Sequence, residues 1–156
     1  MLRIALFEPE IPPNTGNIIR LAANTGFSLH LIRPLGFSLD DRRMRRAGLD
    51  YSEFASMRVH SDYDAFLAEP GVNPQRVFGI SSRGSTGHYQ AAFQPGDTLL
   101  FGPETRGLPD AVLASLPEGH RLRIPMLPRR RSLNLSNAAS IVVYEAWRQL
   151  GFEGAE

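Results

Sequence analysis

Short apolar runs recur along the chain, and they lack the strict alternation of a half-exposed strand. They predict five buried strands, at Arg3–Phe7, Ser28–Ile32, Arg76–Ser81, Thr98–Phe101 and Arg121–Ile124. Segments with helical spacing predict helices at Asn17–Thr25, Asp41–Ala47, Asp62–Ala68, Pro109–Ser115 and Ala138–Leu150. Strands that alternate with helices are typical of an α/β domain, with a parallel sheet covered by helices on both faces.

Polar residues and glycine mark the ends of the predicted helices. Three residues near helix starts are available as N-caps, namely Asn14, Asp40 and Asp62. Gly26 is placed to close the first helix, and Asn134 or Ser136 to cap the last one. We expect residues 1–156 to form a single domain, with a mobile tail after Gly151.

The composition removes several classes of chemistry. The chain has 156 residues and no cysteine, which excludes disulfides, thiolate nucleophiles and zinc sites built from cysteine. All 17 basic residues are Arg, so a Walker A lysine and a Schiff-base lysine are also excluded. The four His are scattered and no metal-binding motif occurs, so we expect no metal. Without a membrane-spanning run or a signal-like start, we expect a cytoplasmic protein.

Three polar segments follow predicted strands and would meet at one edge of the sheet. They are Glu8–Arg20, Phe101–Leu108 and the stretch from Ile124 to Asn137. In open α/β sheets, ligands bind beyond the carboxyl ends of the strands. The sequence therefore predicts one cleft built from these three segments.

The last of these segments carries the strongest signal. Three Arg, two Ser and two Asn surround one strand-to-helix turn, at Arg129–Asn137. Such a turn gathers backbone donors, amides and positive charge, which suits an anionic or strongly polar ligand. The alternative is a helix start with more polar residues than its cap requires.

The other two segments each allow two interpretations. In the first, Asn17 and Arg20 lie three residues apart on one helix face and would both point into the cleft, with Glu104 as a partner for Arg20. Alternatively, Asn14 is only a cap and Arg20 a solvated residue. In the second, Gly102 would let a ligand approach the backbone closely, or would only form a turn before the next helix.

Two clusters of arginine are candidates for phosphate contacts. The first, Arg42, Arg43, Arg45 and Arg46, has Asp40, Asp41 and Asp50 nearby, which favours a solvated helix face. Together with Arg129–Arg131, however, it would supply two basic patches of the kind that position a phosphate backbone.

The three polar segments resemble the motifs of the SPOUT-class RNA 2'-O-methyltransferases. The matching stretches are Pro-Glu-Ile-Pro-Pro-Asn14-Thr-Gly-Asn-Ile-Ile-Arg20, Phe-Gly102-Pro-Glu104-Thr-Arg-Gly-Leu and Ile124-Pro-Met followed by Arg131-Ser132-Leu-Asn134-Leu-Ser-Asn. The resemblance covers nearly the whole chain and is closest to the small bacterial tRNA (cytidine/uridine-34-2'-O)-methyltransferases. It implies a C-terminal trefoil knot, S-adenosylmethionine as cofactor, a homodimer, and the anticodon stem-loop of tRNA as substrate.

The resemblance also implies roles for individual residues. Six would bind the cofactor: Ile80, Gly102, Ile124, Met126, Ser132 and Leu133. Four would serve catalysis, Arg20, Asn14, Glu104 and Asn134. Besides Arg20, RNA contacts are expected from Arg43, Arg46 and Arg129, Arg130 and Arg131. The last predicted helix is apolar on most of its circumference, so we expect Tyr144 in a dimer interface.

The residue types agree with methyl transfer to a ribose hydroxyl. The hydroxyl attacks an electrophilic methyl group, so no nucleophilic side chain is needed and alignment supplies much of the rate. Arg20 suits a bidentate phosphate contact, but its guanidinium stays protonated, so we expect it to orient the nucleophile. Two alternatives stay open: methylation of another tRNA or rRNA position, and a non-catalytic RNA-binding domain.

Overall fold

The computed structural model describes residues 1–46, 51–54 and 56–156. Within these ranges, seven strands form one parallel sheet in the order β3-β2-β1-β6-β4-β7-β5. The strands are β1 (Arg3–Phe7), β2 (Ser28–Ile32), β3 (Met57–His60), β4 (Val77–Ile80), β5 (Thr86–Gly87), β6 (Thr98–Phe101) and β7 (Arg121–Arg123). The α-helices are α1 (Pro12–Thr25), α2 (Arg42–Arg45), α3 (Tyr63–Leu67), α4 (Asp110–Ser115) and α5 (Leu135–Gln149). Short 3₁₀ helices are η1 (Tyr51–Phe54), η2 (Pro74–Arg76) and η3 (His88–Gln90).

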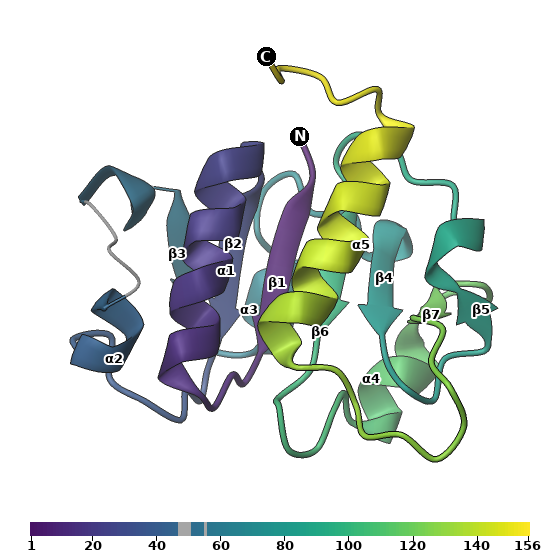
Figure 1. The fold of residues 1–156 in the computed structure, drawn as a ribbon, viewed down its shortest axis with the longest axis horizontal. Coiled ribbons are helices and arrows are strands. Elements are labelled where there is room, and N and C mark those ends of the chain that lie inside the picture. Colours follow the sequence, from purple (N-terminus) through teal and green to yellow (C-terminus); the bar gives the residue numbers. More distant parts are fainter. Residues whose placement is uncertain (47–50, 55) are drawn as a thin grey trace.

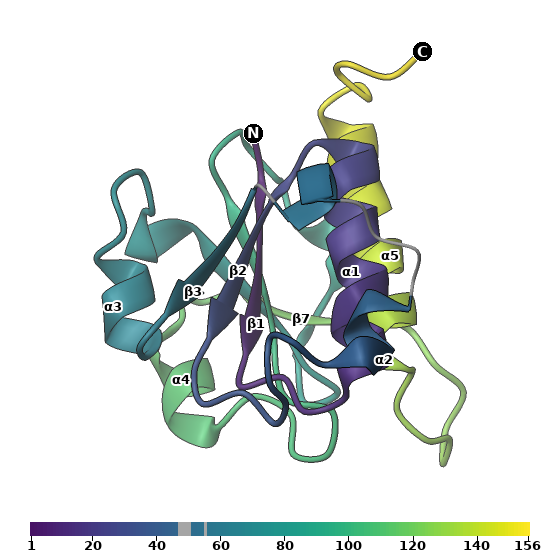
Figure 2. The same ribbon diagram turned by 90° about the vertical axis from the view of Figure 1, so that its left-hand side faces the viewer.

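Helices cover both faces of the sheet, which confirms the predicted α/β class. The long helices α1 and α5 lie side by side on one face, and α3 and α4 lie on the other (Figures 1 and 2). Each face has its own apolar core. Ile18, Ile19 and Val142 belong to the core under α1 and α5, whereas Phe66 and Leu113 belong to the core under α3 and α4.

All five predicted strands are present, with ends that differ by at most one residue. Arg76 belongs to η2, and Ser81 and Ile124 lie just beyond their strands. Two edge strands were not predicted. In β3 buried and exposed residues are mixed, with only His60 buried, and β5 has only two residues. Strands this short and this exposed carry too weak an apolar signal to be recognised.

The first helix starts earlier than predicted. It begins at Pro12 instead of Asn17, and its N-cap is Ile11, which makes no side-chain cap bond. Proline suits the first turn because its missing N–H has no helical partner there. Asn14 is therefore not a cap: it lies inside the first turn and is 5% exposed. Gly26 closes the helix in the left-handed conformation, as predicted.

The other predicted caps have mixed outcomes. Asp62 caps α3 by accepting from the backbone N–H of Ala65, at 2.7 Å, and Asn134 caps α5, as predicted. The prediction of Asp40 as a cap is wrong, because Asp41 caps α2. The prediction that α2 reaches Ala47 lies partly outside the described residues, and the described helix ends at Arg45.

Helix α2 packs directly on the first turn of α1. A Cβ atom at Gly16 would lie 2.3 Å from the carbonyl oxygen of Met44, so only glycine permits this approach. Met44 itself is completely buried. The contact places the arginine-bearing helix next to the loop that follows β1.

Candidate active site

A cavity of about 470 Å³ opens at the carboxyl ends of the strands. Its walls come from the segments after β1, β4, β6 and β7 and from the start of α5. This size is in the range of pockets that hold small organic ligands. The predicted convergence of three polar segments is therefore confirmed, and the loop after β4 adds a fourth.

Most of the predicted site residues lie in the wall of this cavity. All six residues expected at the cofactor do so: Ile80, Gly102, Ile124, Met126, Ser132 and Leu133. Three of the four residues expected in catalysis join them, Asn14, Glu104 and Asn134. The chain thus brings residues more than a hundred positions apart to one place.

Two glutamates clamp the loop after β1 to the loop after β6. The carboxylate of Glu104 accepts hydrogen bonds from the backbone N–H of Glu10, at 2.9 Å, and of Ile11, at 2.5 Å. In the opposite direction, the carboxylate of Glu10 accepts from the backbone N–H of Thr105, at 2.9 Å, and from its hydroxyl, at 2.7 Å. These bonds hold the pKa of Glu10 below its ordinary value, with the backbone bond from Thr105 as the largest cause. We call these reciprocal bonds the carboxylate clamp.

The clamp continues to the start of α5 through two asparagines. The amide of Asn14 is 3.4 Å from the carboxylate of Glu104, and its oxygen accepts a 3.0 Å hydrogen bond from the amide nitrogen of Asn134. The oxygen of Asn134 in turn accepts from the backbone N–H of Ser136, at 2.9 Å. Asn14 and Asn134 therefore connect both long helices to the cavity.

An ion pair adds a third contact between the same two loops. Arg106, which lines the cavity, pairs with Glu8 at 3.1 Å. Glu8 has φ 49°, a left-handed conformation that is uncommon for a residue with a Cβ atom. This turn at the end of β1 directs the chain toward the loop after β6.

The role predicted for Gly102 needs a different physical explanation. We expected it to make room for a ligand, but a Cβ atom there would lie 2.3 Å from the backbone nitrogen of Leu108 and 2.5 Å from the carbonyl carbon of Gly107. The clash is thus with the residue's own loop. Glycine is required at this position because the loop after β6 folds back tightly on itself.

Arg20 lies outside the cavity wall of its own chain, contrary to the prediction. Its Nε atom is 3.7 Å from the carboxylate of Glu53 in η1, and its side chain is 43% exposed. The expected pairing with Glu104 is wrong, since the carboxylate of Glu104 is bonded to the loop after β1. Asn17, expected beside it in the cleft, is exposed and does not line the cavity.

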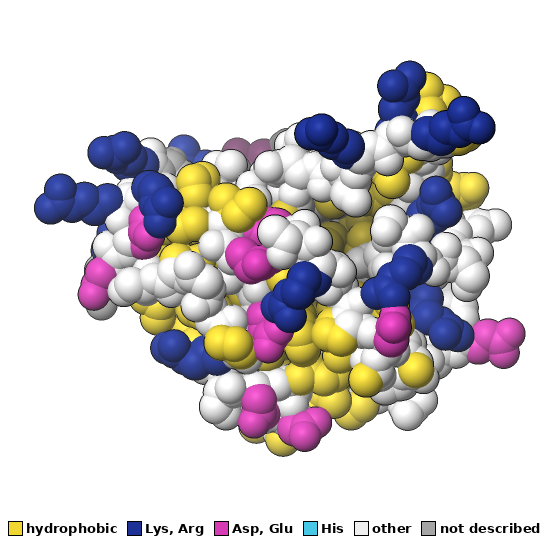
Figure 3. Space-filling view, turned by 90° about the horizontal axis from the view of Figure 1, so that it is seen from below, with side chains coloured by type: hydrophobic (Ala, Val, Ile, Leu, Met, Phe, Trp, Pro, Cys, Tyr) yellow, Lys and Arg dark blue, Asp and Glu magenta, His cyan; other side chains and the backbone are white. Residues whose placement is uncertain are grey.

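The predicted RNA-contacting arginines are exposed. Arg43 is bonded to Asp41 at 2.9 Å, and Arg46 follows it at the end of α2. The segment Arg129–Arg131 is exposed throughout. Figure 3 shows the face at the carboxyl ends of the strands, where basic side chains lie on either side of a central apolar area. Acidic side chains are interspersed, so the charge on this face is mixed.

The loop after β4 was not predicted to belong to the site. Ser81, Ser82 and Arg83 line the cavity, yet they were not among the predicted site residues. The signal was available, because these hydroxyl and guanidinium groups directly follow a buried strand, as the other three segments do.

Among the residues described, no group of three or more His, Asp or Glu side chains is placed to hold a metal ion. In the same part of the chain, no helix is long and apolar enough to cross a membrane.

The chain is similar to known methyltransferases over nearly its whole length. The chain is 61% identical over 155 residues to the tRNA (cytidine(34)-2'-O)-methyltransferase of Escherichia coli K12, covering 99% of this chain and 98% of the relative. A solved structure that concerns "the 2-OH methylation of C/U34 on tRNA" is 50% identical, with a TM-score of 0.88 over 97% of both chains. The methyltransferase AviRb from Streptomyces viridochromogenes, solved with AdoMet, is 27% identical with a TM-score of 0.77, over 96% of this chain and 58% of AviRb. A model of the SpoU rRNA methylase family matches residues 1–144, and with these relatives it establishes that the chain belongs to this family.

Proposed function

We propose that this protein is an S-adenosylmethionine-dependent methyltransferase, acting on the 2'-hydroxyl of nucleotide 34 in the anticodon loop of tRNA. The nucleotide would be cytidine or a modified uridine. One observation carries the proposal: the three motif segments meet in a single cavity, in a chain about 60% identical over its full length to enzymes named for this reaction.

The cavity suits the proposed cofactor. Its wall combines apolar side chains, such as Ile80, Ile124 and Met126, with the polar groups of Ser132 and the loop after Gly102. An adenosine needs this mixture, because its faces are apolar and its edges form hydrogen bonds. When bound, S-adenosylmethionine supplies an electrophilic methyl group. We propose that these residues and Leu133 hold it beside Asn14, Glu104 and Asn134.

Arg20 is proposed to act on the RNA side of the reaction. A guanidinium contacts phosphate oxygens through two parallel hydrogen bonds, which would fix the ribose that carries the reacting hydroxyl. Since Arg20 is outside the cavity of its own chain, we propose that the working site is shared between two copies. Arg20 of one copy would then serve the cavity of the other.

The arginine clusters are proposed to grip the RNA backbone. Arg43 and Arg46 on one side, and Arg129–Arg131 on the other, are exposed and would contact phosphates of the stem-loop. A loop nucleotide is a suitable target because its base is splayed out and its ribose is accessible, whereas a 2'-hydroxyl in a helix lies in an ordered groove.

We extend the proposal to the assembly and to the chain path. The protein would be a cytoplasmic homodimer, with a trefoil knot in the C-terminal part of a single domain covering residues 1–156. Residues 151–156 are proposed to be mobile, although Trp147 donates a hydrogen bond to the carbonyl of Glu153 at 3.1 Å.

The decisive experiment measures methyl transfer to defined tRNA transcripts and to tRNA from cells that lack this protein, followed by nucleoside mapping. The proposal expects 2'-O-methylation at position 34. A methyl group on another ribose would move the activity to a different tRNA or rRNA position. RNA binding without any transfer would favour a non-catalytic RNA-binding domain.

A further inference from the structure

Few charged groups face the cavity. Of the described residues that line it, three have an ionisable side chain: Glu104, Arg106 and Arg83. The amino-acid end of S-adenosylmethionine carries a carboxylate, whose transfer from water is costly unless a charged or hydrogen-bonding partner replaces the solvent. Arg83 and Arg106 are the two cavity residues with the positive charge to bind it.

Arg106 is already paired with a partly buried carboxylate. Its guanidinium is 3.1 Å from Glu8, whose side chain is only 21% exposed. Releasing Arg106 would leave Glu8 at a constrained turn without its partner. Glu104 has the wrong charge, and its oxygens accept hydrogen bonds from Glu10 and Ile11.

The counter-ion of Arg83 is far more exposed to water than that of Arg106. Arg83 pairs with Asp110, whose side chain is 88% exposed, and it donates to the carbonyl oxygen of Leu108 at 2.5 Å. An ion pair with so exposed an aspartate contributes little, because water solvates that carboxylate well without the arginine. A ligand carboxylate inside the cavity could therefore replace Asp110 at small cost.

The loop after β4 holds Arg83 at the cavity wall. Its backbone N–H donates to the hydroxyl of Ser81 at 3.1 Å, and the N–H of Gly84 donates to the carbonyl of Ser81 at 3.0 Å. A Cβ atom at Gly84 would lie 2.5 Å from the backbone of Leu122, so this loop is pressed against the end of β7. The position of Arg83 is therefore set by the fold, while its side chain is still 51% exposed.

We propose that Arg83 binds the carboxylate at the amino-acid end of S-adenosylmethionine and of its demethylated product. This inference rests on the proposed function. It assigns to the loop after β4 the recognition of the cofactor's charged end, while the apolar wall holds the adenosine.

Calorimetric titration with two ligands tests the assignment without measuring activity. S-Adenosylhomocysteine has the carboxylate, whereas 5'-methylthioadenosine keeps the adenosine and the sulfur but lacks the amino-acid end. For Arg83→Gln, we expect affinity for S-adenosylhomocysteine to fall about tenfold, which equals about 1.4 kcal/mol. Affinity for methylthioadenosine should change by less than about twofold, since an uncharged end loses no charge-assisted hydrogen bond.

Two further variants separate ligand binding from a structural role. Asp110→Asn removes the competing carboxylate, so S-adenosylhomocysteine should bind as tightly as before or more tightly. If Arg83 only braced the loop through Asp110, this variant would weaken both ligands. Arg106→Gln is the matched control at the same cavity, and it should not discriminate between the two ligands in the way that Arg83→Gln does.

Three outcomes would overturn the inference. They are an equal loss for both ligands in Arg83→Gln, no loss for either, and weaker tRNA binding with unchanged S-adenosylhomocysteine binding. The last result would assign Arg83 to an RNA phosphate. Failure of the proposed cofactor use looks different, because the unmodified protein would then bind neither ligand. A different methylated nucleotide would contradict the proposed substrate and leave this assignment standing.

Discussion

At the scale of single residues, Asn134 has two structural tasks in one amide group. Its oxygen caps α5 by accepting from the N–H of Ser136, and its nitrogen donates to Asn14 at the cavity. A helix start and a candidate active site therefore depend on the same side chain. From the sequence, Asn134 was predicted both as a cap and as an active-site residue, but only the structure shows that one side chain does both.

Asn134→Asp separates these two tasks. Aspartate is as good an N-cap as asparagine, so the free energy of unfolding should change by less than about 0.5 kcal/mol. The donor to Asn14 is lost, however, and Asn14 would face carboxylates from both Asp and Glu104. We expect methyl transfer to fall strongly. Thermal unfolding and a transfer assay measure the two effects, with Asn134→Ala as the control that also loses about 1 kcal/mol of capping. Full activity in the aspartate variant would contradict the proposed role.

Arg20 provides a second test at this scale. Arg20→Ala should keep its affinity for S-adenosylhomocysteine but lose transfer by about a hundredfold or more, because the reacting ribose would no longer be aligned. Arg20→Lys should recover little, since an ammonium cannot reproduce the planar two-bond contact. Calorimetry and initial rates measure these effects. Equal losses of binding and turnover would place Arg20 in the fold instead.

The partners of such residues were the hardest features to predict. Local sequence indicated which side chains are polar and which strand they follow, and nine of the predicted residues line the cavity. The ion pair of Arg20 with Glu53, by contrast, depends on how η1 packs against α1. The tight turn that requires Gly102 likewise appears only when the loop's own backbone is seen.

At the scale of elements, β2 and β3 are joined by a buried pair of histidines. His30 and His60 are 3% and 8% exposed, their ring nitrogens are 2.9 Å apart, and Phe66 of α3 packs edge-on against both rings. Burial, followed by the charges of His60 and Arg3, lowers the pKa of His30 to about 4. Burial also lowers the pKa of His60, while Glu69 opposes the shift and Arg58 adds to it.

This pair predicts a loss of stability in mild acid. Because histidine in the unfolded chain titrates near about 6.5, the unfolded chain takes up protons first as the pH falls. Stability should be intact above that value and decline toward pH 4, by up to about 1.4 kcal/mol per pH unit for each extra proton bound. Urea unfolding at pH 7.5 and 5.5 measures the decline, and His30→Phe should reduce it. An identical decline in that variant would assign the effect to other groups.

The elements also show where the pattern of apolar and polar residues no longer predicts the secondary structure. Buried strands in the centre of the sheet were predicted nearly to the residue, because both of their faces are apolar. The edge strands β3 and β5 were not predicted, because they are short and partly exposed to water. The start of α1 was misplaced because Asn14 is a plausible cap, whereas the structure uses it inside the cavity.

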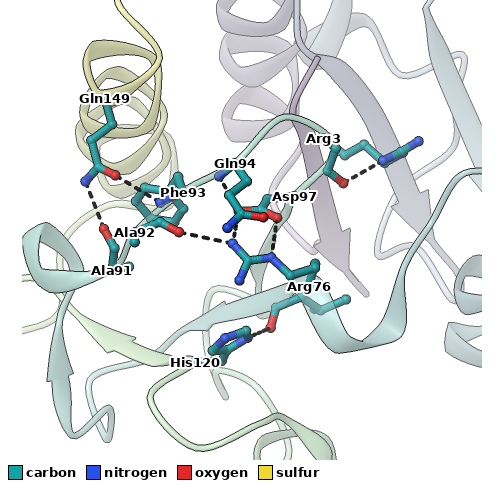
Figure 4. Close-up of polar contacts among 11 residues, drawn as sticks. Arg3, Arg76, Ala91, Ala92, Phe93, Gln94, Asp97, His120 and Gln149 are labelled. Atoms are coloured by element: carbon teal, nitrogen blue, oxygen red, sulfur yellow. Dashed lines mark hydrogen bonds and ion pairs between the residues drawn. The ribbon is translucent and has the colours of Figure 1, made fainter.

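At the scale of the whole molecule, the end opposite the cavity is held by a buried ion pair. Asp97 is 1% exposed and binds the guanidinium of Arg76 through two hydrogen bonds, of 2.8 and 2.7 Å (Figure 4). Arg76 also donates to the carbonyl of Ala92, and Gln149 of α5 bonds to the backbone of Ala91 and Phe93. The segment before β6 is thus tied both to η2, which leads into β4, and to α5.

Breaking this pair should destabilise the protein without touching the cavity. Asp97→Ala leaves a partly buried guanidinium without its partner, and we expect a loss of about 3 kcal/mol in the free energy of unfolding. Affinity for S-adenosylhomocysteine should be unchanged at temperatures where the variant is folded. Urea unfolding and calorimetry test both statements, with the surface variant Asp64→Ala as a control. A loss below 1 kcal/mol would contradict the assigned importance of the pair.

The proposed homodimer makes a prediction about α5. Its outer face exposes Ile141 and Tyr144, at 40% and 45%, with Tyr144 packed edge-on against Trp147. Placing a carboxylate there would require its desolvation in an interface, so Tyr144→Asp should weaken self-association at least about tenfold. Sedimentation at micromolar concentration measures this, and Tyr144→Phe is the control. A stable monomer in the unmodified protein would refute the dimer.

The carboxylate clamp has a consequence for how this protein can evolve. Each of Glu10 and Glu104 satisfies donors in the opposite loop, so replacing one alone leaves backbone N–H groups without an acceptor, at about 1–3 kcal/mol where they are buried. A second change at the other glutamate cannot repair this loss, because the donors belong to the backbone and remain whatever side chain stands there. Each position should therefore resist replacement independently, even though the two carboxylates join loops that are 94 residues apart in the chain.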